Sequence, residues 1–312
     1  MFNDKLRPWV YAVLLATGSV LLFLGGPDYY SSRSYKHCWD IGHIIYFALF
    51  AGLFARWRFI AAMSVAGQWA TTLLVSLLLG ACIELAQYDT ARTPDIADVL
   101  RDLTGSLVAL SFGPPGLRLQ PVRLRRALQV SVFMLLVIQL VPIARSLIDE
   151  AIARRQYPVL SDFETAFEVD RWVGSAGRSI QAMPSISPGN LLKLSLGTDR
   201  YSGAELKYFD GDWSSFRTLD FRLYNPDEEP LKITCRIHDL RHLDGKEEYE
   251  DRFNRRYLLR KGWNDIEVDL EEVKESPAGR RMDMSNIRGL GLFVTSLPAP
   301  RVVYLDNVRL SP

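Results

Sequence analysis

Cysteine is scarce in this chain of 312 residues, and the patterns that mark metal sites and common catalytic centres are missing. The three cysteines, Cys38, Cys82 and Cys235, lie far apart and form no CxxC pair, which argues against a disulfide framework and a zinc site. No phosphate-binding loop, HExxH motif or nucleophile motif occurs, so the sequence favours a protein that is not an enzyme.

Excess charge is missing too. The formal net charge is +1, and no basic tract carries interleaved aromatic residues, so we expect no nucleic-acid partner. The residue types are nevertheless distributed unevenly. Long uncharged stretches lie before residue 150, whereas charged residues, proline, asparagine and glycine crowd the part after it. The length and this division predict two domains.

The first half contains five stretches that predict membrane spans, because a helix needs about 20 predominantly apolar residues to cross a bilayer. Residues 8–27, 59–83 and 127–144 carry no charge, whereas residues 41–55 and 96–112 are interrupted by polar side chains. We interpret the first stretch as a retained span rather than a signal peptide, because further spans follow it.

The basic residues of the short loops predict the orientation, since Lys and Arg concentrate on the cytoplasmic side of membrane proteins. These residues are more frequent in the loops that become cytoplasmic when the N-terminus is placed inside. Five spans then place the second half of the chain outside. We therefore expect a multi-pass protein of the bacterial cytoplasmic (inner) membrane, in contact with membrane lipid, with an extracytoplasmic C-terminal domain.

The second half shows a period of two residues, which is typical of half-buried strands. Leu231, Ile233, Cys235 and Ile237 alternate with polar neighbours, and similar alternation recurs in residues 266–270 and 302–307. Turn signals such as Asn225-Pro226 separate these segments. The fold class that follows is an α-helical transmembrane bundle over residues 1–148, a stalk or linker over 149–158, and an all-β jelly-roll sandwich over 159–312.

Polar side chains interrupt the predicted spans at helical spacing. Asp95, Asp98 and Asp102 are three and four residues apart and share one helix face. In the predicted topology this stripe meets others at the outer end of the bundle. The cluster consists of Asp40, His43, Glu84, Gln87, Arg92, Asp95, Asp98, Arg101 and Asp102. Such groups either lock helices together or bind or move something within the membrane.

The same residues carry a family resemblance. The segment from Glu84 to Gln87, then Arg92, then Asp98 to Gly105, resembles the signature of the VanZ-like family, and the segment from Asp40 to Tyr46 resembles its earlier motif. Asp102 stands where that family usually has Asn, and the earlier motif lacks its Lys. The resemblance covers about residues 8–145. It implies a small multi-pass membrane protein of an antibiotic-resistance-related family, and no defined activity.

A second resemblance covers about residues 159–312. Among its segments are Asp212 to Phe216, Gly262 to Asn264 and Tyr304 to Val308, and their order is similar to galactose-binding-like jelly rolls of the carbohydrate-binding-module type. The resemblance implies a glycan ligand and a structural calcium that ties the first strand to the last. The expected ligand-binding residues are Tyr208, His238, Asp239, Arg241, His242, Arg252 and Asn254. The expected calcium ligands are Asp162, Glu164 and Asp306.

Three functions remain open from the sequence. The first, which we favour, is a membrane protein that displays a glycan-binding β-sandwich for a cell-envelope or polysaccharide-related process. The second is an enzyme or transporter for a lipid-linked saccharide or envelope precursor, centred on the intramembrane cluster. The third is a scaffold whose β-domain binds another protein.

Overall fold

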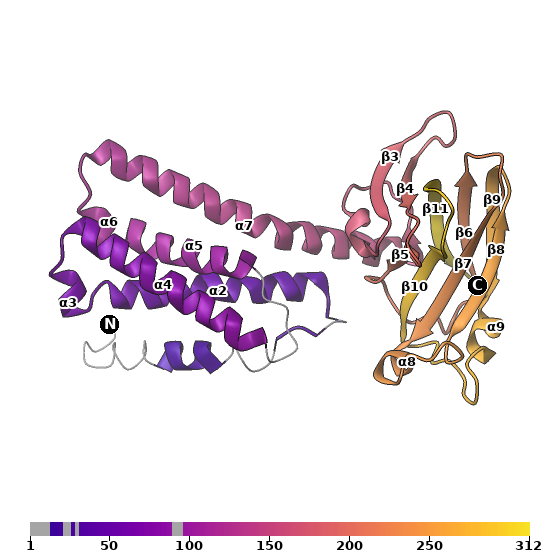
Figure 1. Cartoon of the computed structure of the whole chain (residues 1–312), viewed down its shortest axis with the longest axis horizontal. Coiled ribbons are helices and arrows are strands. Elements are labelled where there is room, and N and C mark those ends of the chain that lie inside the picture. The colour runs from indigo at the N-terminus through magenta and orange to yellow at the C-terminus, as the bar shows by residue number, and fades with distance from the viewer. Residues whose placement is uncertain (1–12, 21–25, 29–30, 89–95) are drawn as a thin grey trace. The chain divides into compact units, whose positions relative to one another are not determined.

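The computed structural model describes residues 13–20, 26–28, 31–88 and 96–312. The chain divides into two compact units, a helical one over Met1–Ser146 and a β-rich one over Leu147–Pro312 (Figure 1). The helices of the first unit whose ends the structure describes are α2 (Arg33–Phe54), α3 (Arg58–Ala61), α4 (Val65–Tyr88), α5 (Ile96–Phe112), α6 (Pro114–Leu117) and α7 (Val122–Gln156), the last of which continues into the second unit. Residues 13–20 are helical as well.

Three helices of the described part are long and apolar enough to cross a membrane: Arg33–Phe54, Val65–Ala86 and Val122–Gln156. The predicted helical first half is therefore confirmed and contains three candidate membrane spans, whereas the number of five spans is not confirmed. Half of the first predicted span, residues 8–12 and 21–25, lies outside the described residues. The fourth, Ile96–Phe112, is a helix of 17 residues that carries three charged side chains and does not count among the three.

Glycines allow the helices of the first unit to approach closely. A Cβ atom on Gly105 of α5 would lie 2.2 Å from the carbonyl oxygen of Ile44 on α2. A Cβ atom on Gly80 of α4 would lie 2.5 Å from Oδ2 of Asp102. Small residues at helix contacts are typical of membrane bundles, where packing replaces the hydrophobic effect between helices. The two glycines therefore bring α2, α4 and α5 together around Asp102.

The second unit is a sandwich of two antiparallel sheets (Figure 1). The six-stranded sheet has the order β3-β4-β11-β6-β9, with β1 paired to β11, and the five-stranded sheet has the order β2-β5-β10-β7-β8. The strands are β1 (Val159–Ser161), β2 (Trp172–Val173), β3 (Gly177–Ala182), β4 (Asn190–Leu196), β5 (Ser202–Leu206), β6 (Thr218–Asn225), β7 (Leu231–Asp239), β8 (Phe253–Leu259), β9 (Gly262–Asp269), β10 (Ile287–Val294) and β11 (Arg301–Ser311). Short helices are η1 (Glu168–Arg171), α8 (Leu240–Asp244) and α9 (Leu270–Glu275).

Alternating burial shows why these segments form a sandwich. Along β6 every second side chain is buried, including Leu219, Phe221 and Leu223. Ile233 on β7 and Leu290 on β10 are likewise fully buried in the core between the sheets. A strand with one apolar face must bury that face against another sheet. The predicted β-sandwich is confirmed.

A buried ionic network joins the last turns of α7 to the sandwich within the second unit. The Arg171 guanidinium donates to the Asp149 carboxylate from Nε and Nη2, at 3.0 and 2.8 Å, and from Nη1 to the Leu160 carbonyl at 2.8 Å. Glu168 accepts the backbone N–H groups of Asp162 and Phe163, each at 3.0 Å. Each charge of this network therefore has hydrogen-bond partners inside the domain.

Candidate functional site

The outer face of the five-stranded sheet, here called the five-stranded face, carries a row of polar residues. The strand register aligns Glu205 of β5, Gly291 of β10, Arg236 of β7 and Asn254 of β8. Their neighbours in sequence, such as Ile237, point into the core, so the row faces away from it. The fold thus assembles one surface from four segments that are distant in sequence.

Two glycines of β10 form the floor of this face. A Cβ atom on Gly289 would lie 2.3 Å from Cε1 of His238 and 2.4 Å from Oε1 of Glu205. A Cβ atom on Gly291 would lie 3.3 Å from Nε of Arg236. The absence of side chains on β10 therefore lets three polar side chains lie flat across the sheet.

The centre of the face is electrostatically organised. Arg236 forms an ion pair with Glu205, and its guanidinium carbon lies 5.9 Å from the centre of the Phe293 ring. Burial lowers the pKa of His238 to about 3, assisted by the positive charges of Arg236 and Arg252. Its imidazole is therefore neutral at physiological pH and offers a hydrogen bond rather than a charge.

A groove of about 520 Å³ opens beside the row, between the start of β8 and α9. Tyr249, Arg252 and Asn254 line it, and the Tyr249 side chain is 62% exposed. The Arg252 guanidinium carbon lies 5.6 Å from the centre of the Tyr249 ring, and Asn254 donates from Nδ2 to the Tyr249 carbonyl at 3.1 Å. Because Asn254 belongs to both the row and the groove, the two form one continuous surface.

Several buried polar atoms of this surface have no hydrogen-bond partner among the described residues. They are Nε of Arg236, Nδ1 of His238, Nε of Arg252 and Oδ1 of Asn254. Buried polar atoms of folded proteins are usually paired, so a local group of unpaired donors and acceptors needs an explanation. The fold therefore leaves several polar side chains of this face incompletely paired among the described residues, and Arg252 and Asn254 are partly exposed at the groove.

Other residues expected at the site serve the fold instead. Asp239 is fully buried and accepts two hydrogen bonds from the Arg280 guanidinium, at 2.6 and 2.9 Å. It also accepts the backbone N–H groups of Asp283 and His242, the second as the N-cap of α8. Arg280 binds Asp251 in addition. Asp239 therefore anchors the segments around the groove from below.

The remaining expected ligand residues lie around this anchor or outside the groove. His242 is buried, its ring centre lies 5.3 Å from that of His238, and its Nδ1 atom lies 3.4 Å from Oδ2 of Asp251. Arg241 is exposed on α8. Tyr208 is half-buried after β5 and lines neither hollow described here. The structure therefore brings together His238, Arg252 and Asn254.

Sequence reasoning missed Glu205, Arg236, Tyr249 and the glycine floor. The alternation of residues 231–238 does place Arg236 and His238 on the same side of β7. That signal was available, since it is the period that predicts the strand. Glu205 and Gly291 come from other strands, and only the strand register aligns them with Arg236.

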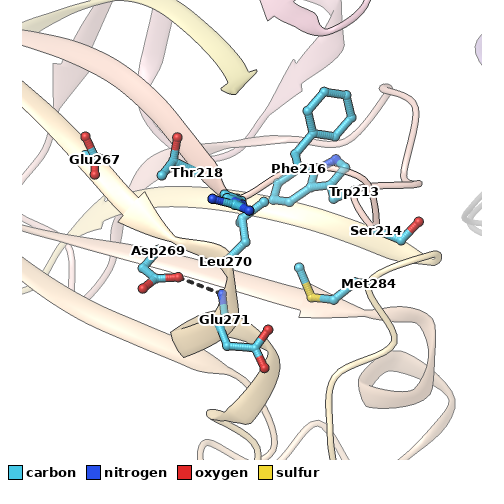
Figure 2. A pocket seen from close by; sticks show the side chains of 10 residues that line it. Trp213, Ser214, Phe216, Thr218, Glu267, Asp269, Leu270, Glu271 and Met284 are labelled. Carbon is cyan, nitrogen blue, oxygen red and sulfur yellow. Dashed lines mark hydrogen bonds between the residues drawn. The ribbon is translucent and has the colours of Figure 1, made fainter. Parts of the chain in front are cut away.

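A second hollow, of about 430 Å³, is lined mainly by polar groups that already have hydrogen-bond partners within the protein. Figure 2 shows the carboxylates of Glu267, Asp269 and Glu271 on one side, and Trp213 and Met284 on the other. Asp269 caps α9, and Glu271 binds Lys274 at 3.0 Å. Trp213 is 1% exposed and donates to the Asp210 carbonyl, as expected for a residue that closes the end of the sandwich. This hollow is the weaker candidate for a ligand site.

The helical unit gathers much of the expected intramembrane cluster. His43 lies 2.9 Å from Oδ1 of Asp102 through Nδ1 and 3.9 Å from Oδ2 of Asp98 through Nε2. Arg101 pairs with Asp98 and lies 3.4 Å from Asp40. Glu84 is buried. Arg92, Asp95 and the side chain of Gln87 lie outside the described residues.

The expected calcium ligands lie in one neighbourhood but form no metal site. Burial raises the pKa of Asp306, and the negative charges of Glu164 and Asp162 raise it further. Asp162 accepts hydrogen bonds from Gln156 at 3.3 Å, and Glu164 accepts the backbone N–H of Asn190. In the described part of the chain, no group of three or more His, Cys, Asp or Glu side chains is placed to hold a metal ion.

No family model and no curated protein matches this chain. Part of it is similar to an exo-β-agarase, with 19% identity and a TM-score of 0.40, over 49% of this chain and only 24% of that chain. The family 11 carbohydrate-binding module of Clostridium thermocellum, solved with a β-1,3-1,4-mixed-linked tetrasaccharide, has 20% identity and a TM-score of 0.37, over 49% of this chain and 94% of that chain.

Likenesses of this size carry no argument about a ligand or an activity. A ligand can therefore be inferred only from the residues and the geometry of the chain itself. None of the comparisons supports the VanZ-like resemblance of the first half or its link to antibiotic resistance.

Proposed function

We propose that the β-sandwich is an extracytoplasmic glycan-binding domain and that the helical unit anchors it in the cytoplasmic membrane of a bacterium. The five-stranded face and its groove carry this proposal, because the partly exposed polar side chains of Arg252 and Asn254 lie beside the exposed ring of Tyr249. The ligand would belong to an envelope polysaccharide or a lipid-linked saccharide.

The chemistry of a sugar fits this surface. Each hydroxyl group donates and accepts hydrogen bonds, so neighbouring hydroxyls can meet the guanidinium of Arg252 and the side-chain amide of Asn254, both partly exposed at the groove. The apolar C–H face of a sugar ring can pack on an exposed aromatic ring such as Tyr249. A volume of about 520 Å³ lies within the usual range of ligand pockets.

Binding of the full-length protein in detergent to an array of bacterial glycans tests the proposal. We expect retention of a subset of glycans, and at least a tenfold loss in the variants Tyr249→Ala and Asn254→Ala. Arg222→Gln is the matched control, because Arg222 lies on the other sheet and pairs with Asp265. A folded protein that retains no glycan, or equal losses in all three variants, would refute the proposed site.

The proposed orientation has its own test. The excess of Lys and Arg in alternate loops supports a cytoplasmic N-terminus and an external Pro312. Alkaline phosphatase, which is active only outside the cytoplasm, would be fused after Pro312. We expect an active fusion, and an inactive fusion at good expression would overturn the orientation.

A second candidate function concerns the cluster of the helical unit, which would bind or process the lipid-linked end of a saccharide. It is favoured by one observation: Oδ2 of Asp102 is buried without a hydrogen-bond partner among the described residues, while His43 holds Oδ1. Ionisable groups inside membranes are costly and usually functional.

Near-isosteric variants separate function from packing at this cluster. We expect Asp98→Asn to abolish the envelope phenotype of a gene deletion while the protein accumulates normally in the membrane. Ser106→Ala, which removes a hydrogen bond of 2.9 Å to Ser76 in the same bundle, serves as the packing control. Loss of the Asp98→Asn protein itself would indicate a structural role.

A further inference from the structure

The two outer faces of the sandwich differ in charge. On the six-stranded face the register places the carboxylates Asp220, Asp265, Glu267, Asp269 and Asp306 against the cations Lys193, Arg222 and Arg309. On the five-stranded face it places Lys232, Arg236 and Arg256 against Glu205. The first surface therefore has an excess of negative charge and the second an excess of positive charge.

The positive charge of the five-stranded face is only partly neutralised within the protein. Glu205 is the one carboxylate that the described strands place on this face, and it pairs with Arg236. Three cations form no ion pair with any described residue: Lys232, Arg256 and Arg252, which directly precedes β8. Glu205 and Glu247 act on Arg252 only at longer range.

Arg252 is the cation best placed to act on a ligand. It lines the groove together with Asn254 and forms no ion pair with a described residue. Glu250, Arg255 and Glu272 line the groove too, and Arg255 pairs with Glu272. Burial lowers the pKa of Arg252, and the charge of Arg236 lowers it further. The strand register pairs Arg236 with Asn254, and Arg252 stands two residues before Asn254. An anion bound at this point of the face would be attracted by both guanidinium groups.

We infer that the glycan bound by the five-stranded face is anionic and carries a carboxylate, sulfate or phosphate group that Arg252 and Arg236 bind. The inference rests on the proposed glycan-binding function and narrows the class of ligand. A planar guanidinium binds such groups through two parallel hydrogen bonds, which gives direction as well as affinity. The sugar hydroxyls meet Asn254 and the ring meets Tyr249.

Matched pairs of polysaccharides test the charge of the ligand. The full-length protein in detergent is offered polygalacturonate against fully methyl-esterified polygalacturonate, and dextran sulfate against dextran. We expect at least tenfold tighter binding of an acidic member than of its neutral partner. The first pair reports a carboxylate and the second a sulfate, so the arms distinguish the anionic groups.

Variants assign the preference to this face. In Arg252→Gln the difference within a pair should fall below threefold. Asn254→Asp retains the size of the side chain and adds a negative charge. This variant should weaken the binding of the acidic polymer more than the binding of the neutral one. Arg222→Gln removes one positive charge from the six-stranded face and should leave the preference unchanged.

Different negative results separate failure of the anionic ligand from failure of the proposed glycan-binding function. Equal binding within both pairs, or retention of neutral glycans alone on the array, would overturn the anionic ligand and leave glycan binding intact. A preference that survives in Arg252→Gln and Asn254→Asp would overturn the assignment to the five-stranded face. A folded protein that binds no polysaccharide at all would overturn the proposed function together with this inference.

Discussion

Arg171 and Arg252 belong to the same domain and meet opposite surroundings. Arg171 is 1% exposed, and its guanidinium donates to Asp149 and to the Leu160 carbonyl. Arg252 is half-buried at a groove and forms no hydrogen bond or ion pair with any residue that the structure describes. The first arginine is paired within the fold, whereas the second is left without a charged partner at the surface of the groove.

The difference shows how burial and pairing together separate stability from binding. Breaking a buried ion pair by removing one partner is strongly destabilising, because the remaining charge is then buried without compensation. A partly buried charge without partners contributes little to stability and retains its capacity to bind. The contrast between Arg171 and Arg252 predicts effects of different size, and the largest is expected from the loss of Arg171.

Removal of Arg171 should destabilise the domain most. Arg171→Ala leaves Asp149 and Glu168 buried without the guanidinium, so we expect a loss of about 3–5 kcal/mol in the free energy of unfolding. Urea unfolding of the fragment 147–312 measures it. A fragment that begins at residue 159 lacks Asp149 and should be destabilised similarly. A loss below about 1 kcal/mol in both would mean that the network is dispensable.

His238 should make the domain sensitive to acid. Its pKa lies at about 3 in the folded domain against an ordinary value of 6.5, so only the unfolded chain takes up this proton between those values. Stability should therefore fall as the pH falls, by about 2 kcal/mol between pH 6.5 and pH 5. The slope of stability against pH should be smaller in His238→Gln. It should not vanish, since burial also lowers the pKa of His242.

Arg252 should show the reverse of Arg171. Arg252→Ala should change the free energy of unfolding by less than about 0.5 kcal/mol, because no hydrogen bond is lost. The same variant should lose at least tenfold in glycan affinity, equivalent to about 1.4 kcal/mol. Calorimetry and glycan binding on one preparation give both quantities. A large loss of stability would remove the contrast with Arg171.

Asp306 should give the smallest effect and also tests the calcium expected from the sequence. Burial and two neighbouring carboxylates raise its pKa, so its ionised form is unfavourable in the folded domain. Asp306→Asn should therefore stabilise the domain at neutral pH, by at most about 1 kcal/mol, when calcium is chelated. If calcium binds, its addition should stabilise the original chain and not the variant. No response to calcium in either protein would exclude the ion.

The sequence predicted more of the fold than of the site. Apolar length predicted the long apolar helices and alternation predicted β7, because each signal lies within one segment. The polarity of the stretch from His238 to Arg256 predicted a binding loop, which stays a prediction, and Asp239 was included in it. Its oxygens are taken by Arg280, 41 residues further on, and no local pattern indicates such a contact.

By itself, the sequence determined that the chain has an apolar helical half and an alternating β half, since both follow from the period of hydrophobic residues along the chain. The tertiary structure decided which polar side chains are paired within the fold and which are left without a partner at the surface. Arg171 and Arg252 are chemically identical in the sequence. Only strand register and packing give one a buried carboxylate and leave the other beside an open groove.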